Sequence, residues 1–286
     1  MAGTVTAFIE PARNGRTFTE AAESYLRNGG EARYLTRITE YFGNTPIAEI
    51  TPYAITTMLK ALYPNHSGST RNRQGITPAP AVMIHAYERG WCPLIRLRKF
   101  REEPRRRKAP ASPTWLHVFC RQADRDGLSH VAALVVFMAH TGARVSEAIR
   151  LAWSDVDLAS RRAVLIRTKT ETNSVRHLTD DLVARLQDLK DNADPDMPVF
   201  RYTSRFGVNE RIAAVCRRAE IPYKSSHACG RHSFATNAID LGMDVKTAME
   251  AGGWKSSQIF LETYVHSRDP GRLVADRFNA FRFSEV

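Results

Sequence analysis

Four side chains that could attack and hold a phosphodiester lie within the last third of the chain. They are His227, Arg231, Trp254 and Tyr264. A phosphodiester opens without a metal when a nucleophile attacks in line, positive groups hold the non-bridging oxygens, and an acid protonates the departing oxygen. Tyrosine suits the first task because a phosphotyrosine ester stores the energy of the broken bond, and arginine suits the second because its planar fork binds two phosphate oxygens. The stretch predicts phosphodiester chemistry that needs no metal or other cofactor.

The chain carries a large excess of positive charge, concentrated in its first third. Its formal net charge is +11 and its isoelectric point is about 9.8. Residues 1–109 hold 17 Lys and Arg against 9 Asp and Glu, whereas residues 110–286 hold 24 against 21. A cationic surface of this size attracts polyanions over a Debye length or more, so nucleic acid is the predicted partner.

Neither a membrane span nor a secretory leader is visible in the sequence. No run approaches the roughly 18 apolar residues that cross a bilayer, and residues 1–15 lack an apolar core behind a basic start. The cysteines lie far apart, without a C-x-x-C pair or zinc-finger spacing. They are Cys92, Cys120, Cys216 and Cys229. We expect a cytoplasmic protein with buried free thiols, no metal site and no membrane partner.

Helical patterns fill the chain from residue 17 to residue 95, after a lead-in over 1–16 that we expect to be flexible. Thr17-Phe18-Thr19-Glu20 has the spacing of a capping box, and Thr51-Pro52 marks a second helix start. Apolar residues recur at helical spacing between these signals, and no convincing strand interrupts them. The pattern predicts a small all-helical domain over 17–95.

Two basic segments of this region are predicted to bind DNA. On the segment that begins at Ser69, Arg71 and Arg73 either enter a DNA groove or form a solvated basic face. The second segment is a linker over 96–113, which is rich in arginine and proline and either tracks a phosphate backbone or only adds solubility. Its basic residues include Arg105, Arg106, Arg107 and Lys108. Such a linker would let two domains close around a duplex as a clamp.

Residues 114–286 are predicted to form a second domain, mainly helical with one small β-hairpin. The helix expected at 129–140 is apolar nearly all round, so it belongs in a core. Residues 161–168 and 174–178 have the pattern of two paired strands, and this pairing places Lys169 at the mouth of the hairpin.

The tail from Pro270 to Phe283 shows apolar residues at helical spacing. They are Leu273, Val274, Phe278 and Phe281. A terminal helix with this much apolar surface needs a partner, which is either its own domain or a neighbouring subunit.

Five motifs in a fixed order make the chain resemble the tyrosine recombinase (phage integrase) family. They are Tyr41-Phe42-Gly43 with Ile50-Thr51, Thr141-Gly142-Ala143-Arg144-Val145-Ser146-Glu147, Thr168-Lys169-Thr170, Arg231-His232-Ser233-Phe234-Ala235-Thr236, and Tyr264. The resemblance covers nearly the whole chain from Thr17 onwards. It implies a helical DNA-binding domain followed by a catalytic domain, acting together on double-stranded DNA.

The resemblance also implies a role for each residue of the predicted site. Arg144, which starts a helix, and Arg231 resemble the two arginines that bind the scissile phosphate. Lys169 resembles the hairpin lysine that protonates the departing 5′-hydroxyl, and Tyr264 resembles the nucleophile that forms a 3′-phosphotyrosine. Glu147 resembles the acidic residue that supports this arrangement, and no metal is implied.

The sequence departs from the family pattern at the histidine. Members usually place it three residues before the second arginine, where this chain has Ala228, and His227 lies one residue further away. Either a turn at Cys229-Gly230 absorbs the extra residue, which we favour because glycine adopts backbone angles closed to other residues, or the site has no such histidine. Trp254 stands where many members have histidine, and its indole N–H can donate to phosphate but cannot transfer a proton. His232 is expected to be structural.

These features favour a site-specific DNA recombinase or integrase that assembles as a tetramer on DNA, with the C-terminal helix as a candidate subunit contact. One alternative is a DNA-binding protein on the same fold that has lost cleavage, which the displaced histidine would explain. Another is a relaxing enzyme similar to a type IB topoisomerase. About 16 residues precede the first predicted helix, too few for the extra arm-site domain of some integrases, so simple target sites are expected.

Overall fold

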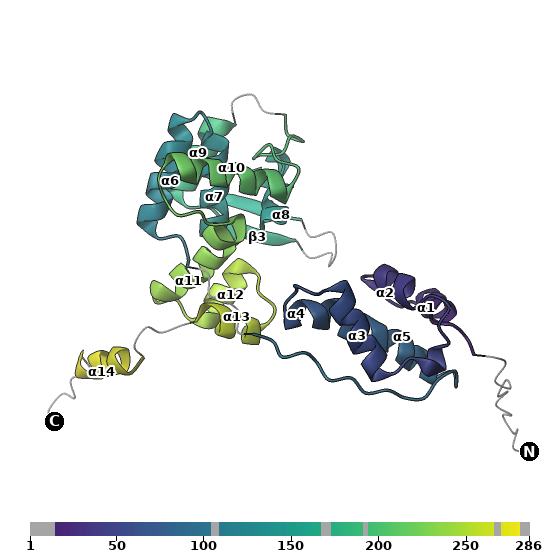
Figure 1. Ribbon diagram of the computed structural model, residues 1–286. Coiled ribbons are helices and arrows are strands. Elements are labelled where there is room, and N and C mark those ends of the chain that lie inside the picture. The colour runs from purple at the N-terminus through teal and green to yellow at the C-terminus, as the bar shows by residue number, and fades with distance from the viewer. Residues whose placement is uncertain (1–14, 104–108, 167–172, 191–193, 266–269, 281–286) are drawn as a thin grey trace, which may run out of the picture. The chain divides into compact units, whose positions relative to one another are not determined.

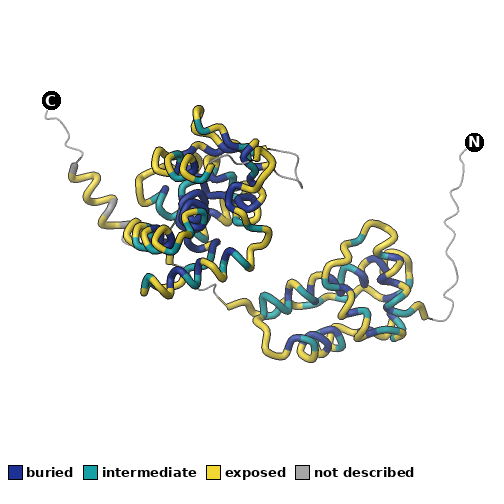
Figure 2. Tube along the Cα trace, turned by 90° about the horizontal axis from the view of Figure 1, so that it is seen from above, coloured by how far each residue is buried: buried dark blue, intermediate teal, exposed yellow. Residues whose placement is uncertain are grey.

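The computed structural model describes residues 15–103, 109–166, 173–190, 194–265 and 270–280, and the chain divides into two compact units, Met1–Arg106 and Arg107–Val286. Both units are built mainly from helices, and the second adds a small antiparallel sheet (Figure 1). Buried residues concentrate inside each unit (Figure 2). The predicted fold class, mainly helical with a small sheet, is confirmed. Within the described ranges, no helix has the length and apolar character to cross a membrane.

The first unit packs its helices around one apolar core. Its elements are α1 (Phe18–Arg27), α2 (Leu35–Phe42), η1 (Ile47–Glu49), α3 (Pro52–Leu62), α4 (Gly68–Arg71), η2 (Asn72–Ile76) and α5 (Pro78–Tyr87). The predicted capping box is present, because the Glu20 carboxylate accepts from the Thr17 N–H (2.8 Å) and the Thr17 hydroxyl accepts from the Glu20 N–H (3.2 Å). The Thr51 hydroxyl caps α3, and Pro52 occupies its first turn.

The chain after α5 stays attached to the first unit. The Asn72 side-chain amide donates to the Phe100 carbonyl (2.9 Å), and the Phe100 N–H donates to Asn72 Oδ1 (2.8 Å). Partly buried side chains of the same stretch pack on the core: Ile95, Leu97 and Phe100. Further along, Ala111 is fully buried in the second unit, and its N–H donates to Ser233 Oγ (2.7 Å). The segment 96–113 therefore contains residues that belong to each unit.

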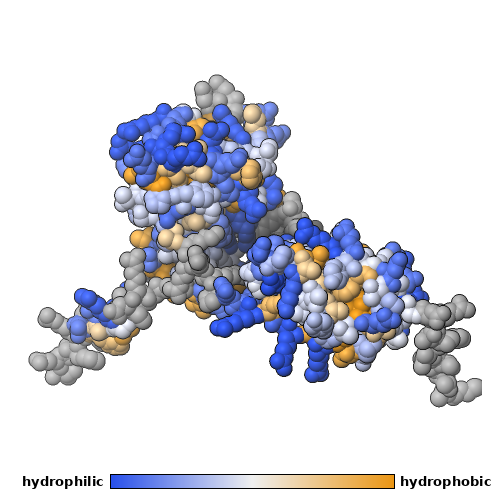
Figure 3. Space-filling model, in the orientation of Figure 1, coloured by the Kyte–Doolittle hydropathy of each residue, from blue (hydrophilic) through white to orange (hydrophobic). Residues whose placement is uncertain are grey.

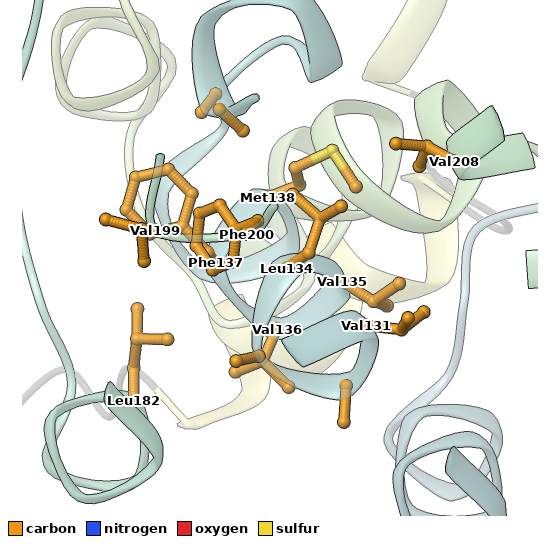
Figure 4. Close-up of a cluster of buried hydrophobic side chains, with 14 of the residues drawn as sticks. Val131, Leu134, Val135, Val136, Phe137, Met138, Leu182, Val199, Phe200 and Val208 are labelled. Atoms are coloured by element: carbon orange, nitrogen blue, oxygen red, sulfur yellow. The ribbon is translucent and has the colours of Figure 1, made fainter. Parts of the chain in front are cut away.

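The second unit is organised around one buried helix. Its helical elements are α6 (Pro113–Arg125), α7 (Ser129–Thr141), α8 (Val145–Ala148), η3 (Trp153–Asp155), α9 (Asp180–Leu189), α10 (Arg205–Arg218), η4 (Ala228–His232), α11 (Ser233–Asp240), α12 (Val245–Gly252), α13 (Ser257–Tyr264) and α14 (Pro270–Ala280). Every residue from Val131 to Ala139 on α7 is buried, as its apolar sequence predicts (Figure 4). All four cysteines of the chain are buried and free, which confirms that prediction.

The sheet is a hairpin with one short additional strand. β2 (Arg162–Leu165) pairs with β3 (Ser174–His177), and β1 (Val156–Asp157) pairs with the other edge of β2, all antiparallel. The predicted hairpin is therefore present, with Val164 opposite Val175. Its connection, 167–172, lies outside the described residues and includes Lys169.

The helices α11, α12 and α13 form a small apolar cluster of their own within the second unit. Its buried members are Ala235, Ala238, Ala248, Phe260 and Tyr264. The last helix, α14, differs from these because Val274 is 52% exposed and Phe278 is 68% exposed, and Figure 3 shows apolar surface on this helix.

Candidate active site

Arg231 is buried and held from several sides by backbone carbonyl groups. Its Nη1 donates to the carbonyls of Gly142 (2.6 Å) and Gly252 (2.7 Å), and its Nη2 donates to that of Gly253 (3.3 Å). The residue is only 3% exposed, and its guanidinium lies 3.5 Å from the centre of the Trp254 ring. These three bonds orient the guanidinium and use three of its five N–H groups.

Arg231 sits in a π-helical turn, η4, whose close packing depends on a glycine. A Cβ on Gly230 would come within 2.5 Å of Met138 Cβ on α7, so only glycine lets the turn approach the central helix this closely. In an α-helix each backbone N–H donates to the carbonyl four residues earlier, and in a π-helix it donates to the carbonyl five residues earlier. A π-helical turn therefore contains about one more residue. Arg231 lies within this turn, and His227 is the residue immediately before it.

The two positions proposed for the family histidine have opposite surroundings. Ala228, the first residue of η4, is only 4% exposed, and its carbonyl accepts a hydrogen bond from Ser233 Oγ (2.7 Å). His227, immediately before the turn, is exposed. The two positions therefore differ in their exposure to solvent.

Arg144 lies at the start of α8 and is held by Glu147. One Glu147 carboxylate oxygen accepts from the Arg144 backbone N–H (2.9 Å), and the other accepts from Arg144 Nη1 (2.6 Å). The Glu147 side chain is 6% exposed, whereas that of Arg144 is 48% exposed. The helix expected from Arg144 is shorter than its sequence suggests, since α8 ends at Ala148, so the carboxylate rather than a long helix determines how Arg144 is placed.

The charges around Arg231 favour the binding of an anion. Burial, and then the positive charge of Arg144, lower the pKa of Arg231 to about 9, while Glu147 and Tyr264 raise it and Arg176 lowers it slightly further. At neutral pH the guanidinium remains charged. Arg231 thus feels two further guanidinium groups, those of Arg144 and Arg176, and one carboxylate, that of Glu147, so a bound phosphate would add negative charge where positive charge is in excess.

Tyr264, the last residue of α13, packs against the Trp254 ring that also covers Arg231. The centres of the two rings lie 5.4 Å apart in an edge-on arrangement, and Phe260 lies 5.3 Å from Tyr264. Only 5% of Tyr264 is exposed. Trp254 therefore contacts both the buried arginine and the tyrosine.

Two residues near the site were not assigned to it from the sequence. His232, expected to be structural, is buried, and its ring lies 5.1 Å from that of Tyr264. Arg176 on β3 is 2% exposed and donates from Nη1 to the Ala251 carbonyl (2.5 Å) and from Nη2 to the Gly252 carbonyl (3.1 Å). Strand patterning contains no signal for the contacts of Arg176, because their acceptors lie 75 and 76 residues away in the sequence.

The structure thus gathers part of the predicted site in one place. Contacts or charge interactions link a set that includes the two predicted phosphate-binding arginines and the predicted nucleophile: Arg144, Glu147, Arg231, Trp254 and Tyr264. Lys169 and the basic residues 105–108 lie outside the described residues.

The two arginines predicted to bind DNA in the first unit differ in their contacts. Arg71 donates from Nε to the Tyr63 carbonyl (2.9 Å) and from Nη2 to the Pro64 carbonyl (2.7 Å), and it lies over the Phe100 ring. Arg73 is exposed. The contacts of Arg71 hold the loop before α4, which leaves Arg73 as the better placed of the two for a phosphate.

Residues 119–270 match the model of the phage integrase family, and the chain belongs to this family. The match includes Arg144, Arg231, Trp254 and Tyr264.

Among individual proteins, the chain is similar to the tyrosine recombinase XerD of Bifidobacterium longum (strain NCC 2705), with 32% identity over 167 residues. That match covers 49% of this chain and 54% of XerD, so the chain spans about half the length of this curated relative. The family relationship rests on the catalytic region.

Several solved structures share the fold over nearly the whole chain. The Tn1549 transposon integrase in complex with transposon right end DNA has a TM-score of 0.70 at 16% identity, covering 92% of this chain and 100% of that one. The XerH site-specific recombinase bound to difH substrate has a TM-score of 0.66 at 16% identity, covering 92% and 85%. A lambda integrase dimer bound to a core site has a TM-score of 0.66 at 14% identity, covering 94% and 79%.

Proposed function

We propose that this protein is a site-specific DNA recombinase that cleaves and rejoins strands through a 3′-phosphotyrosine at Tyr264. The observation that supports this most strongly is the shared contact of Arg231 and Tyr264 with the Trp254 ring. A phosphate held by the Arg231 guanidinium would lie near Tyr264. Unlike Arg231 and Trp254, a tyrosine can form a covalent phosphoester and later release it. Membership of the phage integrase family supports the same reaction class.

Arg231 and Arg144 would bind the scissile phosphate from two sides. Three N–H groups of Arg231 already donate to carbonyls of described residues, so two remain for phosphate oxygens. Arg144 is anchored through Glu147 while nearly half of its side chain is exposed, so it can meet the same phosphate from the solvent side. Negative charge that grows on the non-bridging oxygens would be stabilised by donors that are already oriented.

In the cleavage step, the phenolic oxygen of Tyr264 attacks the phosphorus and the bond to the 5′-oxygen breaks. The phenol loses its proton as it attacks, and the departing 5′-oxygen gains one. Lys169, carried by the hairpin, is the proposed donor of that second proton. Rejoining reverses these steps with the 5′-hydroxyl of the same or another strand, because the ester keeps the energy of the broken bond.

His227 is proposed to occupy the role of the family histidine despite its altered spacing. The π-helical turn η4 would take up one extra residue, and this is supported by its wider geometry and by the exposure of His227 beside the buried Ala228. A histidine near the phosphate can donate to an oxygen or accept the phenolic proton. Trp254 has only a donor N–H, so proton transfer falls to other groups.

Double-stranded DNA is the proposed partner. The surplus of basic residues in the first unit supports this, with Arg73 exposed on the turn between α4 and α5. The residues 105–108, three arginines and a lysine, connect the units and are proposed to follow the phosphate backbone.

A tetramer on DNA is the proposed active assembly, with α14 as the contact between copies. The exposed Val274 and Phe278 give this helix an apolar surface that a second copy could cover. Phe278→Ser is expected to reduce complexes that hold two DNA sites while leaving the binding of a single site intact.

The proposed location is the cytoplasm, where such DNA would be found.

The proposal is tested by trapping the covalent complex on a nicked DNA substrate whose cleaved end diffuses away. Because the target site is unknown, a library of DNA ends is used and the captured DNA is sequenced. Tyr264→Phe should bind DNA and form no adduct, while Tyr223→Phe, an exposed tyrosine of the same unit, should form it normally. An adduct with Tyr264→Phe would overturn the assignment. DNA binding without any adduct would favour a binding-only protein, and relaxation of supercoils without a defined site would favour the topoisomerase-like alternative.

A further inference from the structure

Arg176 occupies a position in the sheet where a charged residue is costly. It lies on β3 opposite Ala163, and it is the one buried residue of that strand, with 2% of its surface exposed. Burying a guanidinium away from water costs free energy unless hydrogen bonds replace the lost hydration. The residue therefore has a specific set of acceptors rather than a general packing role.

Those acceptors are the carbonyls at the end of α12. Arg176 donates to Ala251 and Gly252, and Arg231 donates to Gly252 and Gly253. Two buried guanidinium groups thus meet at three consecutive carbonyls and share the middle one. The last carbonyls of a helix lack partners within the helix and carry partial negative charge, so they attract both cations.

The shared carbonyl belongs to a segment with little freedom to move elsewhere. A Cβ on Gly252 would come within 1.8 Å of the Trp254 ring and 2.8 Å of the Phe234 ring, so the backbone here lies directly against these aromatic rings. Trp254 in turn contacts Arg231 and Tyr264. A shift of the 251–253 backbone would therefore move the ring that both site residues touch.

We propose that Arg176 is a positioning residue for the cleavage reaction: it fixes the end of α12 so that Arg231, Trp254 and Tyr264 keep their mutual placement. It does not touch the phosphate and acts only through the 251–253 carbonyls. The inference rests on the proposed function of Tyr264, and it adds a link from the β-hairpin, which also carries Lys169, to the nucleophile helix.

The test compares Arg176→Met, which keeps the approximate volume and removes all donors, with Arg176→Lys, which keeps one charged donor. The rate of adduct formation on trapped DNA is expected to fall about tenfold or more for Arg176→Met and less for Arg176→Lys, since small displacements of catalytic groups are costly. DNA affinity should be unchanged for both. Arg162→Met, which removes an exposed arginine from β2, serves as the control and should cleave at the normal rate.

A double-variant cycle separates positioning from general destabilisation. If Arg176 acts through Trp254, Arg176→Met should slow cleavage much less in a Trp254→Ala background than in the unchanged protein. Equal fold-losses in both backgrounds, or a normal rate for Arg176→Met, would overturn the inference. If Arg176→Met does not fold, Arg176→Lys is carried through the same cycle. Failure of the proposed function is distinguishable, because the unchanged protein would then form no adduct that depends on Tyr264.

Discussion

Arg231 and Arg144 present two different ways of holding a guanidinium group for a ligand. Arg231 is 3% exposed and donates to three backbone carbonyls, whereas the Arg144 side chain is 48% exposed and is held by one carboxylate. The first unit repeats the contrast, with Arg71 donating to loop carbonyls and Arg73 exposed. An arginine bonded to carbonyls is oriented before any ligand arrives and also supports the fold, while an exposed arginine mainly contributes charge.

Among these variants, replacement of the buried Arg231 should have the largest effect on cleavage. Arg231→Met is expected to reduce adduct formation by about 10³-fold or more, because oriented donors to the developing charge are lost. It should also lower the free energy of unfolding, since each buried carbonyl left without a donor costs about 1–3 kcal/mol. Thermal unfolding and adduct assays would measure both. Arg144→Met should reduce adduct formation by a smaller factor and lower the free energy of unfolding less, because Glu147 keeps its hydrogen bond from the backbone N–H of residue 144. Equal loss of stability in the two variants would contradict the contrast.

Replacement of Glu147, whose carboxylate holds Arg144, should have the second largest effect on cleavage. Cleavage requires charged Arg231, whose pKa is lowered mainly by burial and then by Arg144 to about 9, so kcat/KM should fall as the pH rises through about 9. Glu147→Gln removes a charge that raises this pKa, so the fall should begin at a lower pH. The rate at neutral pH should also fall by about tenfold because Arg144 loses its ion pair.

The pH profile of Glu147→Gln is read against that of Glu250→Gln. Glu250 is an exposed acidic residue on α12 whose ion-pair partner is Lys246, outside the site. Its replacement should leave the profile unchanged. A shift of the Glu147→Gln profile toward higher pH would contradict the assigned sign of the interaction with Arg231.

A smaller effect should distinguish His227 from its neighbour. His227→Ala is expected to slow cleavage by up to about 10²-fold, in the range of lost acid–base or hydrogen-bonding groups, with DNA affinity retained. Ala228→Gly removes only a buried methyl group and should slow cleavage less. Single-turnover adduct rates for the two variants decide the matter, and equal rates would mean that the π-helical turn does not restore the histidine.

The smallest effect on catalysis is expected in the first unit. Arg73→Ala should weaken DNA binding and reduce the slope of log affinity against log salt by about 1, as expected for the loss of one phosphate contact. Arg71→Ala should instead lower stability, because the carbonyls of Tyr63 and Pro64 lose their donor. Salt titrations of DNA binding and thermal unfolding would be measured side by side. If Arg71→Ala weakened DNA binding and Arg73→Ala lowered stability instead, the DNA contact would be assigned to Arg71.

Local signals in the sequence predict the elements of this fold well. The capping box at Thr17, the cap at Thr51 and the all-apolar helix that became α7 are each determined by neighbouring residues, so no knowledge of the rest of the chain is needed. The hairpin is predicted for the same reason, although β2 ends at Leu165 and is shorter than its sequence pattern.

Features that depend on distant partners are not predictable in this way. Alternation along β3 favours burying Val175, yet Val175 is 51% exposed and Arg176 is buried. Arg176 is buried in place of Val175 because the end of α12 supplies acceptors for its guanidinium, and this contact exists only in the folded chain. The contact of His232 with Tyr264 likewise joins two helices that are separate in the sequence.

The most direct test of the central claim is to identify the residue that carries DNA in the trapped adduct. After nuclease digestion, cleavage beside lysine and arginine should release the peptide over residues 256–268, in which Tyr264 is the only tyrosine. Mass spectrometry of this peptide should show the remaining nucleotide attached to Tyr264 through its 3′-phosphate. A nucleotide attached to any other residue, or an adduct in which this peptide is unmodified, would contradict the proposed mechanism.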